Sequence, residues 1–267
     1  MSLPTNAPRP PAFESKAPSS GIETSQIAAA YNAIAAHYDS ELEPADWIRR
    51  RLWERMDRLF PSGSNIVDVT AGTGFDALHL KERGVTVVAC DISPQMLDRL
   101  QEKAPDIKVV LSDFNQLELT GRYDGILSTF AGLNTSADLG PFADRAADLL
   151  RPDGILLIHL LNRWPILDIA RQIMTFRWRD AWHTSMNNAR EVQLSAIKIP
   201  HYLYSPMPLY HAVFARYFRL IRIDGYGFVR PLYAAWGARL DGLERRLAST
   251  FPFHSLGVFF SLEMIRV

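Results

Sequence analysis

The sequence predicts an α/β fold in which helices cover both faces of a doubly wound, mainly parallel sheet of about seven strands. Three observations predict it. Strands and helices alternate about every 20–25 residues between residues 65 and 161. Two expected strands, VTVVACD and GILLIHLL, are almost continuously apolar, as strands covered on both faces are. The first expected strand ends in a glycine loop that opens a helix.

Two helices are expected before the sheet. Residues 1–24 are rich in Pro, Ser and Ala and predict a disordered tail. Thr24 or Ser25 is a suitable N-cap for a helix that runs through QIAAAYNAIAAHYD. Apolar residues at helical spacing predict a second helix over about residues 45–59. We assign residues 25–60 to these helices, as a lid over the sheet.

Residues 61–160 contain the alternating elements of the core. Gly84 is expected to end the first core helix, and Ser93 and Pro94 to start the second as N-cap and first residue. The expected strands cover residues 65–70, 85–91, 107–113, 123–130 and 154–161. The expected helices cover residues 75–84, 93–104 and 139–150, and residues 151–154 form a turn.

The alternation stops after the fifth strand. Residues 161–205 predict an insertion that covers the carboxyl edge of the sheet, with a helix over residues 164–178 and extended chain over 191–205. Residues 206–267 complete the sheet. They predict a helix over 206–217, a strand over 218–228, a helix over about 232–247 and a strand over 255–267. The two late strands have no parallel crossover between them and predict an antiparallel C-terminal hairpin at one edge.

Composition limits the class of protein. Apolar residues make up 48% of the chain, enough for a sizeable core, but no run of 18 apolar residues predicts a membrane span. The first residues lack the apolar stretch of a secretory signal. A single cysteine, Cys90, excludes an internal disulfide and a multi-cysteine metal site. We therefore expect a cytoplasmic enzyme with no bound metal and no membrane partner.

Charge is balanced overall but unevenly distributed. Residues 1–160 carry 22 acidic and 15 basic side chains, whereas residues 161–267 carry 7 acidic and 14 basic ones. The C-terminal excess favours either an anionic substrate or a scattered, solvated arginine surface. The one dense cluster, RRRLWER, has apolar residues at helical spacing and predicts a helix with a charged face. A nucleic-acid partner is not expected.

The glycine loop fits two kinds of ligand. Gly72-x-Gly74-x-x-Ala77 suits a dinucleotide, whose pyrophosphate lies on a helix N-terminus, or S-adenosylmethionine. Asp91 ends the second strand and suits the ribose of either ligand. Asp68 under the loop would repel a pyrophosphate but attract a sulfonium or ammonium group. Asp113 ends the third strand, before Phe114, and suits an adenine amino group. Three carboxylates at successive strand ends favour a cationic nucleoside.

These motifs resemble, in order, those of the class I S-adenosylmethionine-dependent methyltransferases, here of the bacterial small-molecule type. VDVTAGTG is similar to the glycine motif, ACDISPQML to the ribose motif, LSDFNQL to the adenine segment and YDGILSTFAGLN to the motif of the fourth strand. Upstream, YNAIAAHYDSE resembles the lid segment. The resemblance covers about residues 27–160 and implies a Rossmann-like fold with S-adenosyl-L-methionine as cofactor. Thr70 departs from it, because it replaces the first glycine of the motif.

The resemblance also implies a set of cofactor-binding residues in the lid, in the glycine loop and at the strand ends. They are Tyr31, Tyr38, Asp68, Thr70, Ala71, Gly72, Gly74, Asp91, Ile92, Met96, Asp113, Phe114, Thr129 and Phe130. Tyr31 and Tyr38 are seven residues apart and are expected on one face of one helix, either as a lid or as helix packing.

The residues for chemistry and for the acceptor are less defined. His37, His159 and His201 are candidate general bases, although direct displacement at a methyl group can proceed by positioning alone. The aromatic insertion is typical of a pocket wall for a flat substrate, and equally of a cap core or a dimer contact. The candidate substrate residues are Asn134, Trp164, Trp182, His183, Tyr202 and Tyr204.

The sequence thus favours a methyltransferase that acts on an O, N or C nucleophile of a small anionic or aromatic molecule. Two alternatives stay open: an NAD-dependent oxidoreductase, and a non-methylating protein on the same fold. The sequence leaves the oligomeric state open.

Overall fold

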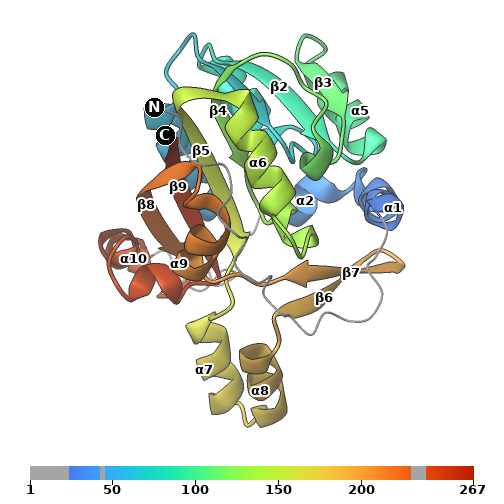
Figure 1. Cartoon of the computed structure of the whole chain (residues 1–267). Helices are drawn as coiled ribbons and strands as arrows, with labels where there is room; N and C mark the ends of the chain where they lie inside the picture. Colours follow the sequence, from blue (N-terminus) through green and yellow to red (C-terminus); the bar gives the residue numbers. More distant parts are fainter. Residues whose placement is uncertain (1–23, 43–45, 230–238) are drawn as a thin grey trace.

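A seven-stranded mixed sheet forms the centre of the molecule (Figure 1). The computed structural model describes residues 24–42, 46–229 and 239–267. Two expected segments lie outside these residues. They are the tail expected over residues 1–24, apart from Thr24, and most of the first half of the helix expected over 232–247. The strand order is β3-β2-β1-β4-β5-β9-β8. One hydrophobic cluster is built around Val67, Ile126 and Phe142, and another around Ile66, Leu127 and Leu80.

The core elements follow the expected alternation. The strands are β1 (Asn65–Asp68), β2 (Thr86–Asp91), β3 (Lys108–Leu111), β4 (Tyr123–Ser128) and β5 (Leu150–Leu161). The helices are α4 (Phe75–Glu82), α5 (Pro94–Lys103) and α6 (Gly140–Leu149). The Ser93 hydroxyl accepts from the Met96 amide at the start of α5, and Gly84 follows α4 with φ +79°, so both expected helix boundaries are confirmed.

Strand β1 pairs in parallel with both β2 and β4, and this pairing positions the site. The chain leaves β1 toward β2 and β3 and then returns to β4 on the other side. The strand order therefore reverses beside β1. In doubly wound sheets, ligands bind at the carboxyl ends of the strands at such a reversal.

The antiparallel C-terminal hairpin is confirmed. Strand β9 (Phe259–Arg266) pairs antiparallel with β5 and with β8 (Phe218–Tyr226). The expected helix over 206–217 is the short α9 (Pro206–Leu209) followed by a π-helical turn, Tyr210–Phe214. The expected start of the last strand was wrong, because Phe253–Ser255 forms a 3-10 turn.

The expected continuous first helix was also wrong. Helix α1 (Thr24–Ile34) ends before a turn, and α2 (Tyr38–Leu42) starts a separate short helix. Asp39 of α2 accepts hydrogen bonds from the Thr73 hydroxyl and from Lys103, which hold α2 against the glycine loop. Helix α3 (Asp46–Leu59) follows, in agreement with the expected helix over 45–59.

The insertion has two parts. The single helix expected over 164–178 is divided into α7 (Ile166–Met174) and α8 (Trp178–Met186), because Phe176 between them has φ +58°, which a helix does not allow. The strands β6 (Ala189–Leu194) and β7 (Ile197–Tyr202) form a separate antiparallel hairpin. Figure 1 shows the α7–α8 pair extending away from the sheet, whereas β6–β7 runs beside α1.

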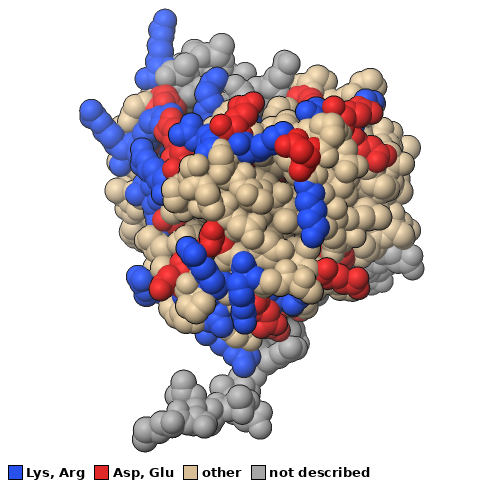
Figure 2. Space-filling view, turned by 90° about the horizontal axis from the view of Figure 1, so that it is seen from above, with Lys and Arg blue, Asp and Glu red and all other residues tan. Residues whose placement is uncertain are grey.

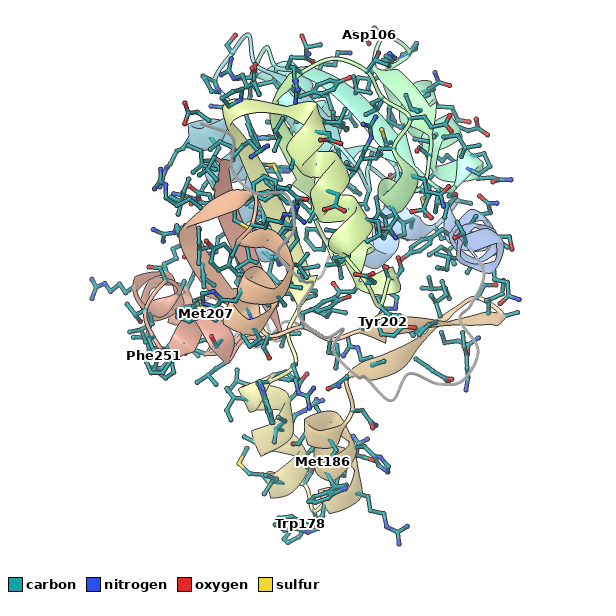
Figure 3. The ribbon with its side chains drawn as sticks, in the orientation of Figure 1. Asp106, Trp178, Met186, Tyr202, Met207 and Phe251 are labelled. Atoms are coloured by element: carbon teal, nitrogen blue, oxygen red, sulfur yellow. The ribbon has the colours of Figure 1, made fainter. Side chains whose placement is uncertain are left out.

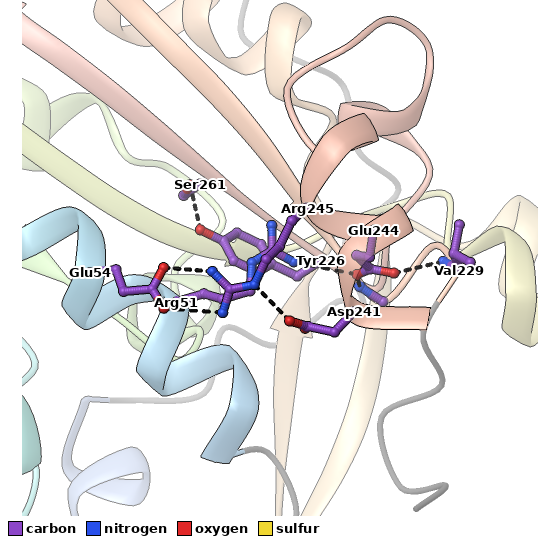
Figure 4. A network of polar contacts seen from close by, with 9 residues as sticks. Arg51, Glu54, Tyr226, Val229, Asp241, Glu244, Arg245 and Ser261 are labelled. Carbon is purple, nitrogen blue, oxygen red and sulfur yellow. Dashed lines mark hydrogen bonds and ion pairs between the residues drawn. The ribbon is translucent and has the colours of Figure 1, made fainter. Parts of the chain in front are cut away.

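Helix α10 (Asp241–Leu247) is held on α3 and β8 by a polar network (Figure 4). The fully buried Glu244 accepts from the amides of Gly227 and Val229 and pairs with Arg51 at 3.7 Å. Arg245 forms a two-bond pair with the exposed Glu54. In the described residues, none of the helices is both long and apolar enough to cross a membrane.

Glu244→Ala should lower the free energy of unfolding by about 3–5 kcal/mol, because it leaves the buried Arg51 charge and two amides without this partner. Glu54→Ala removes an exposed partner from the same network and should cost about 0–1 kcal/mol. Urea denaturation of both variants measures the difference. Equal losses would show that burial of Glu244 does not determine its contribution.

Candidate functional site

A cavity of about 360 Å³ lies at the carboxyl ends of β1, β2 and β4, under α1 and α2. Its volume is at the lower end of the roughly 300–1,000 Å³ range of small-molecule sites. Residues from the lid, the glycine loop, the strand ends and β7 line it. They are Thr24, Ile27, Tyr31, Tyr38, Val69, Thr70, Gly72, Asp91, Ile92, Met96, Ser112, Asp113, Phe114, Asn115, Thr129, Phe130, Gly132, Thr135, Ser136, Ala137, Asp138, Pro200 and Tyr202.

Asp91 fixes the glycine loop to the end of β2. One carboxylate oxygen accepts from the Gly72 amide at 2.8 Å and the other from the Ser93 amide at 2.9 Å. Burial raises the pKa of Asp91, while these two backbone donors act in the opposite direction. Asp91 therefore combines a structural role in the loop with a position at the cavity wall.

Asp68 lies beneath the loop, and its oxygen accepts from the Thr70 amide at 3.3 Å. It is buried but does not line the cavity. Burial raises the pKa of Asp68 well above its usual value, and the nearby carboxylate of Asp76 raises it further. A positively charged ligand above the loop would stabilise the ionised form of this group.

Thr70 connects two strand ends. Its hydroxyl is 2.7 Å from the Ser128 hydroxyl at the end of β4. A Cβ atom added at Gly132 would lie 2.5 Å from the Thr70 Cβ, so the threonine side chain occupies the space that Gly132 leaves free. Thr70 thus replaces the usual glycine of the motif with a side chain that packs against the loop after β4.

Tyr31 and Tyr38 lie together at the cavity wall although they belong to different helices. Their ring centroids are 6.5 Å apart in an edge-to-face arrangement, and both rings line the cavity. A Cβ at Gly72, which has φ +53°, would lie 3.6 Å from the Tyr38 ring. Burial raises the pKa of Tyr38 to about 12, so its hydroxyl stays protonated at neutral pH. The Tyr38 hydroxyl can therefore act as a hydrogen-bond donor.

At the other end of the cavity, Asp113 caps a 3-10 turn, Phe114–Gln116. One of its oxygens accepts from the Asn115 amide at 2.8 Å, and the other accepts from the Thr24 hydroxyl at 3.3 Å. Asp113 and Phe114 line the cavity together with Ile92 and Met96. The expected base-binding residues therefore meet at one end of one cavity.

A buried polar network that the sequence did not indicate lies behind the loop. The Asp76 carboxylate accepts from Arg49 at 3.1 Å, from the Trp53 indole at 2.7 Å and from the Thr129 hydroxyl. The Arg49 guanidinium also stacks on Phe130, 4.1 Å from the ring centroid. The network links α3 and α4 to the two cavity residues Thr129 and Phe130.

Eleven of the fourteen expected cofactor residues line the cavity. The three that do not are Asp68, Ala71 and Gly74. Gly74 has φ +90°, and a Cβ there would lie 2.6 Å from the Leu100 side chain, so this glycine permits close packing of α5. The cofactor-binding roles themselves stay predictions.

Of the six candidate substrate residues, Tyr202 lines the cavity. Asn134 is fully buried and links the loop after β4 to the backbone of Leu161 and Tyr202. The Tyr204 hydroxyl donates to the carbonyl of Ser136, a residue that itself lines the cavity. The other three candidates lie outside this cavity, in the exposed part of the insertion: Trp164, Trp182 and His183.

None of the three candidate histidines lines the cavity. His37 is exposed in the turn between α1 and α2. His159 is fully buried, accepts from the Phe130 amide at 3.2 Å and stacks on Phe259. Burial, together with Arg49 and Arg51, lowers the pKa of His159 to about 3, and burial lowers the pKa of His201 to about 4. Both buried histidines are therefore neutral near pH 7.

Several cavity residues were missed from the sequence. Those in the loop after β4 are Gly132, Thr135, Ser136, Ala137 and Asp138. The position of this loop at the carboxyl edge of the sheet could have indicated that its residues line the site. Ile27 lies four residues before Tyr31 on α1, so helical spacing could have placed it on the same face as Tyr31. Among the described residues there is no group of three or more His, Cys, Asp or Glu side chains able to hold a metal ion.

Buried His159 predicts a dependence of stability on pH. Its pKa is lower in the folded chain than its ordinary value of 6.5, so the unfolded chain binds the proton first as pH falls. Between pH 7 and 5, His159 should reduce the free energy of unfolding by about 2 kcal/mol. Urea denaturation should show a correspondingly weaker pH dependence for His159→Phe. The same dependence in both proteins would contradict this assignment.

Comparison with known proteins agrees with this geometry. Residues 66–154 match a family model described as a methyltransferase domain. A demethylmenaquinone methyltransferase of Beutenbergia cavernae is 29% identical over 136 residues, which cover 49% of this chain and 56% of that protein. The chain spans less than two thirds of the length of the first curated relatives that it matches.

Two solved structures share the fold. The DhpI complex aligns with a TM-score of 0.60 and 16% identity over 94% of this chain and 100% of that chain. The CcbJ methyltransferase of Streptomyces caelestis aligns with a TM-score of 0.59 and 17% identity. The alignment covers 89% of this chain and 98% of that chain. Residues 66–154 thus match a methyltransferase-domain family model, and the chain shares the Rossmann-like fold of these two solved structures.

Proposed function

We propose that the protein binds S-adenosyl-L-methionine in the cavity and transfers its methyl group to an O, N or C nucleophile of a small molecule. One observation carries the proposal: Asp91 and Asp113, at the ends of the neighbouring strands β2 and β3, line one cavity together with Thr70 and Gly72 of the glycine loop. The matched family model and a curated relative, both described as methyltransferases, support the proposal.

The cavity has distinct ends for the parts of the cofactor. We assign Asp91 to accept hydrogen bonds from the ribose hydroxyls, and Asp113 to accept one from the adenine amino group, beside Phe114 and Met96; all four residues line the cavity. The methionine part would lie over Gly72 and Thr70, under the tyrosine lid. Asp68 behind the loop, when ionised, would favour a cationic ligand there and oppose a pyrophosphate, whereas the charge of Asp76 is paired with Arg49.

The acceptor would enter at the side formed by Ser136, Asp138 and Tyr202. Three aspartates line the cavity, and no Lys or Arg is among its described lining residues. This charge disfavours the anionic acceptor considered from the sequence and favours a neutral or cationic one. Because neither buried histidine faces the cavity, transfer would depend mainly on holding the nucleophile in line with the methyl group.

We assign cofactor binding to residues 61–160 and the lid to residues 25–60. Within the insertion of residues 161–205, β7 provides the cavity wall through Pro200 and Tyr202. The α7–α8 pair contributes no lining residue. Residues 206–267 complete the sheet.

Asp91→Ala should weaken binding of S-adenosylhomocysteine by at least tenfold, because each lost hydrogen bond to a charged group is worth about 1.5–3 kcal/mol. Asp98→Asn, which changes an exposed aspartate of α5 outside the cavity, is the control and should bind as the wild type does. Isothermal titration calorimetry measures both, and a parallel melting curve tests whether the loop variant is folded.

The same titration with NAD separates the rival functions. Tight NAD binding with no binding of S-adenosylmethionine would refute the proposal in favour of an oxidoreductase. Cofactor binding without methyl transfer to any component of a metabolite extract would instead favour a non-methylating protein.

A further inference from the structure

The turn between α7 and α8 exposes an unusual number of large apolar side chains. Seven consecutive residues, 173–179, are exposed. Within them Phe176 is 81% exposed, Met174 73% and Trp178 58%, and Trp182 on the next turn of α8 is 65% exposed. We call residues 173–182 the apolar tip. Exposed apolar side chains grouped in this way mark a contact surface in many proteins.

The tip is the end of a protruding element. In Figure 3, Trp178 lies at the far end of the α7–α8 pair, and the sheet lies on the opposite side of that pair. No residue of α7 is buried, and Ala181 is the buried residue of α8. The two helices thus have little core of their own, and the large side chains point outward instead of stabilising the pair.

Arginines accompany the apolar side chains. Residues 163–190 contain five arginines and two aspartates. Arg171, Arg177 and Arg179 are exposed in or next to the tip, and Arg177 pairs with Asp180. Trp and Phe beside arginine are the composition of segments that lie at the interface of a bilayer, with the apolar rings about 5–10 Å deep. The cations then face anionic headgroups.

We propose that the apolar tip docks the protein on the surface of an anionic phospholipid bilayer. The tip is too short to span a bilayer, so the attachment is peripheral. A convex tip suits a fluid surface, which deforms around the rings. A second copy of the chain fits less well, because a two-fold contact would bring the arginines of one tip against those of the other.

The tip and the cavity wall belong to one continuous segment. The chain runs from α8 through β6 into β7, where Pro200 and Tyr202 line the cavity. Docking would therefore act on the side of the cavity where the acceptor is expected to enter. The docking proposal itself does not depend on methyl transfer.

Sedimentation of the full chain with vesicles tests the proposal. The protein should bind vesicles of phosphatidylcholine and phosphatidylglycerol more tightly than vesicles of phosphatidylcholine alone, and added salt should weaken the binding. The double variant Phe176→Asn/Trp178→Gln should bind at least tenfold more weakly. Asn tolerates the positive φ at position 176 and Gln is a good helix former, so the turn should be preserved.

Phe251→Asn is the matched control. Phe251 is 83% exposed, as Phe176 is, but lies on a different part of the molecule (Figure 3). This variant should bind vesicles as the wild type does. No binding of the wild type to either vesicle, or equal binding of the tip variant, would overturn the proposal. A dimer that the tip variant converts to a monomer, with no vesicle binding, would assign the tip to a second copy instead.

Discussion

The buried carboxylate of Asp76 is the interaction on which the site depends. It accepts from Arg49, Trp53 and Thr129, and so connects α3, the helix after the glycine loop and the end of β4. Removal of one member from such a buried network leaves the other charge unpaired. The positions of Thr129 and Phe130 at the cavity wall therefore depend on a residue that does not itself line the cavity.

A second constraint is the close packing of the loops after β1 and β4, at the point where the strand order reverses. Thr70 occupies the space above Gly132, and Tyr38 lies against Gly72. The loop after β1 is thus packed on one side by the loop after β4 and on the other by the lid. Asp91 adds two hydrogen bonds to backbone amides of this region. A Cβ at position 132 would collide with Thr70, whereas position 72 has room for a Cβ but a φ of +53°, which favours glycine.

Acidic and basic side chains lie next to one another on the protein surface. Figure 2 shows Asp and Glu interspersed among Lys and Arg on one face. The basic excess of the C-terminal part is used partly in ion pairs: Arg245 binds Glu54 and Asp241 (Figure 4). The cavity, by contrast, is lined by aspartates. The three cavity aspartates belong to residues 1–160, the part with the acidic excess, so the basic excess of residues 161–267 did not predict the charge of the site.

The sequence by itself determined the sheet, the glycine loop and the carboxylates at the strand ends. Alternating apolar runs, Gly84, and the Ser93-Pro94 helix start are local signals, and the carboxyl ends of parallel strands converge wherever such a sheet forms. Tertiary structure alone decided which aromatic residues meet the cavity. Tyr38 does so because Asp39 holds α2 against the loop, and Trp182 does not, because Phe176 turns the chain away. His159 looked like a base at a strand end, but its side chain is enclosed by Phe130, Phe259 and Tyr226, and burial at this depth depends on residues distant in the sequence.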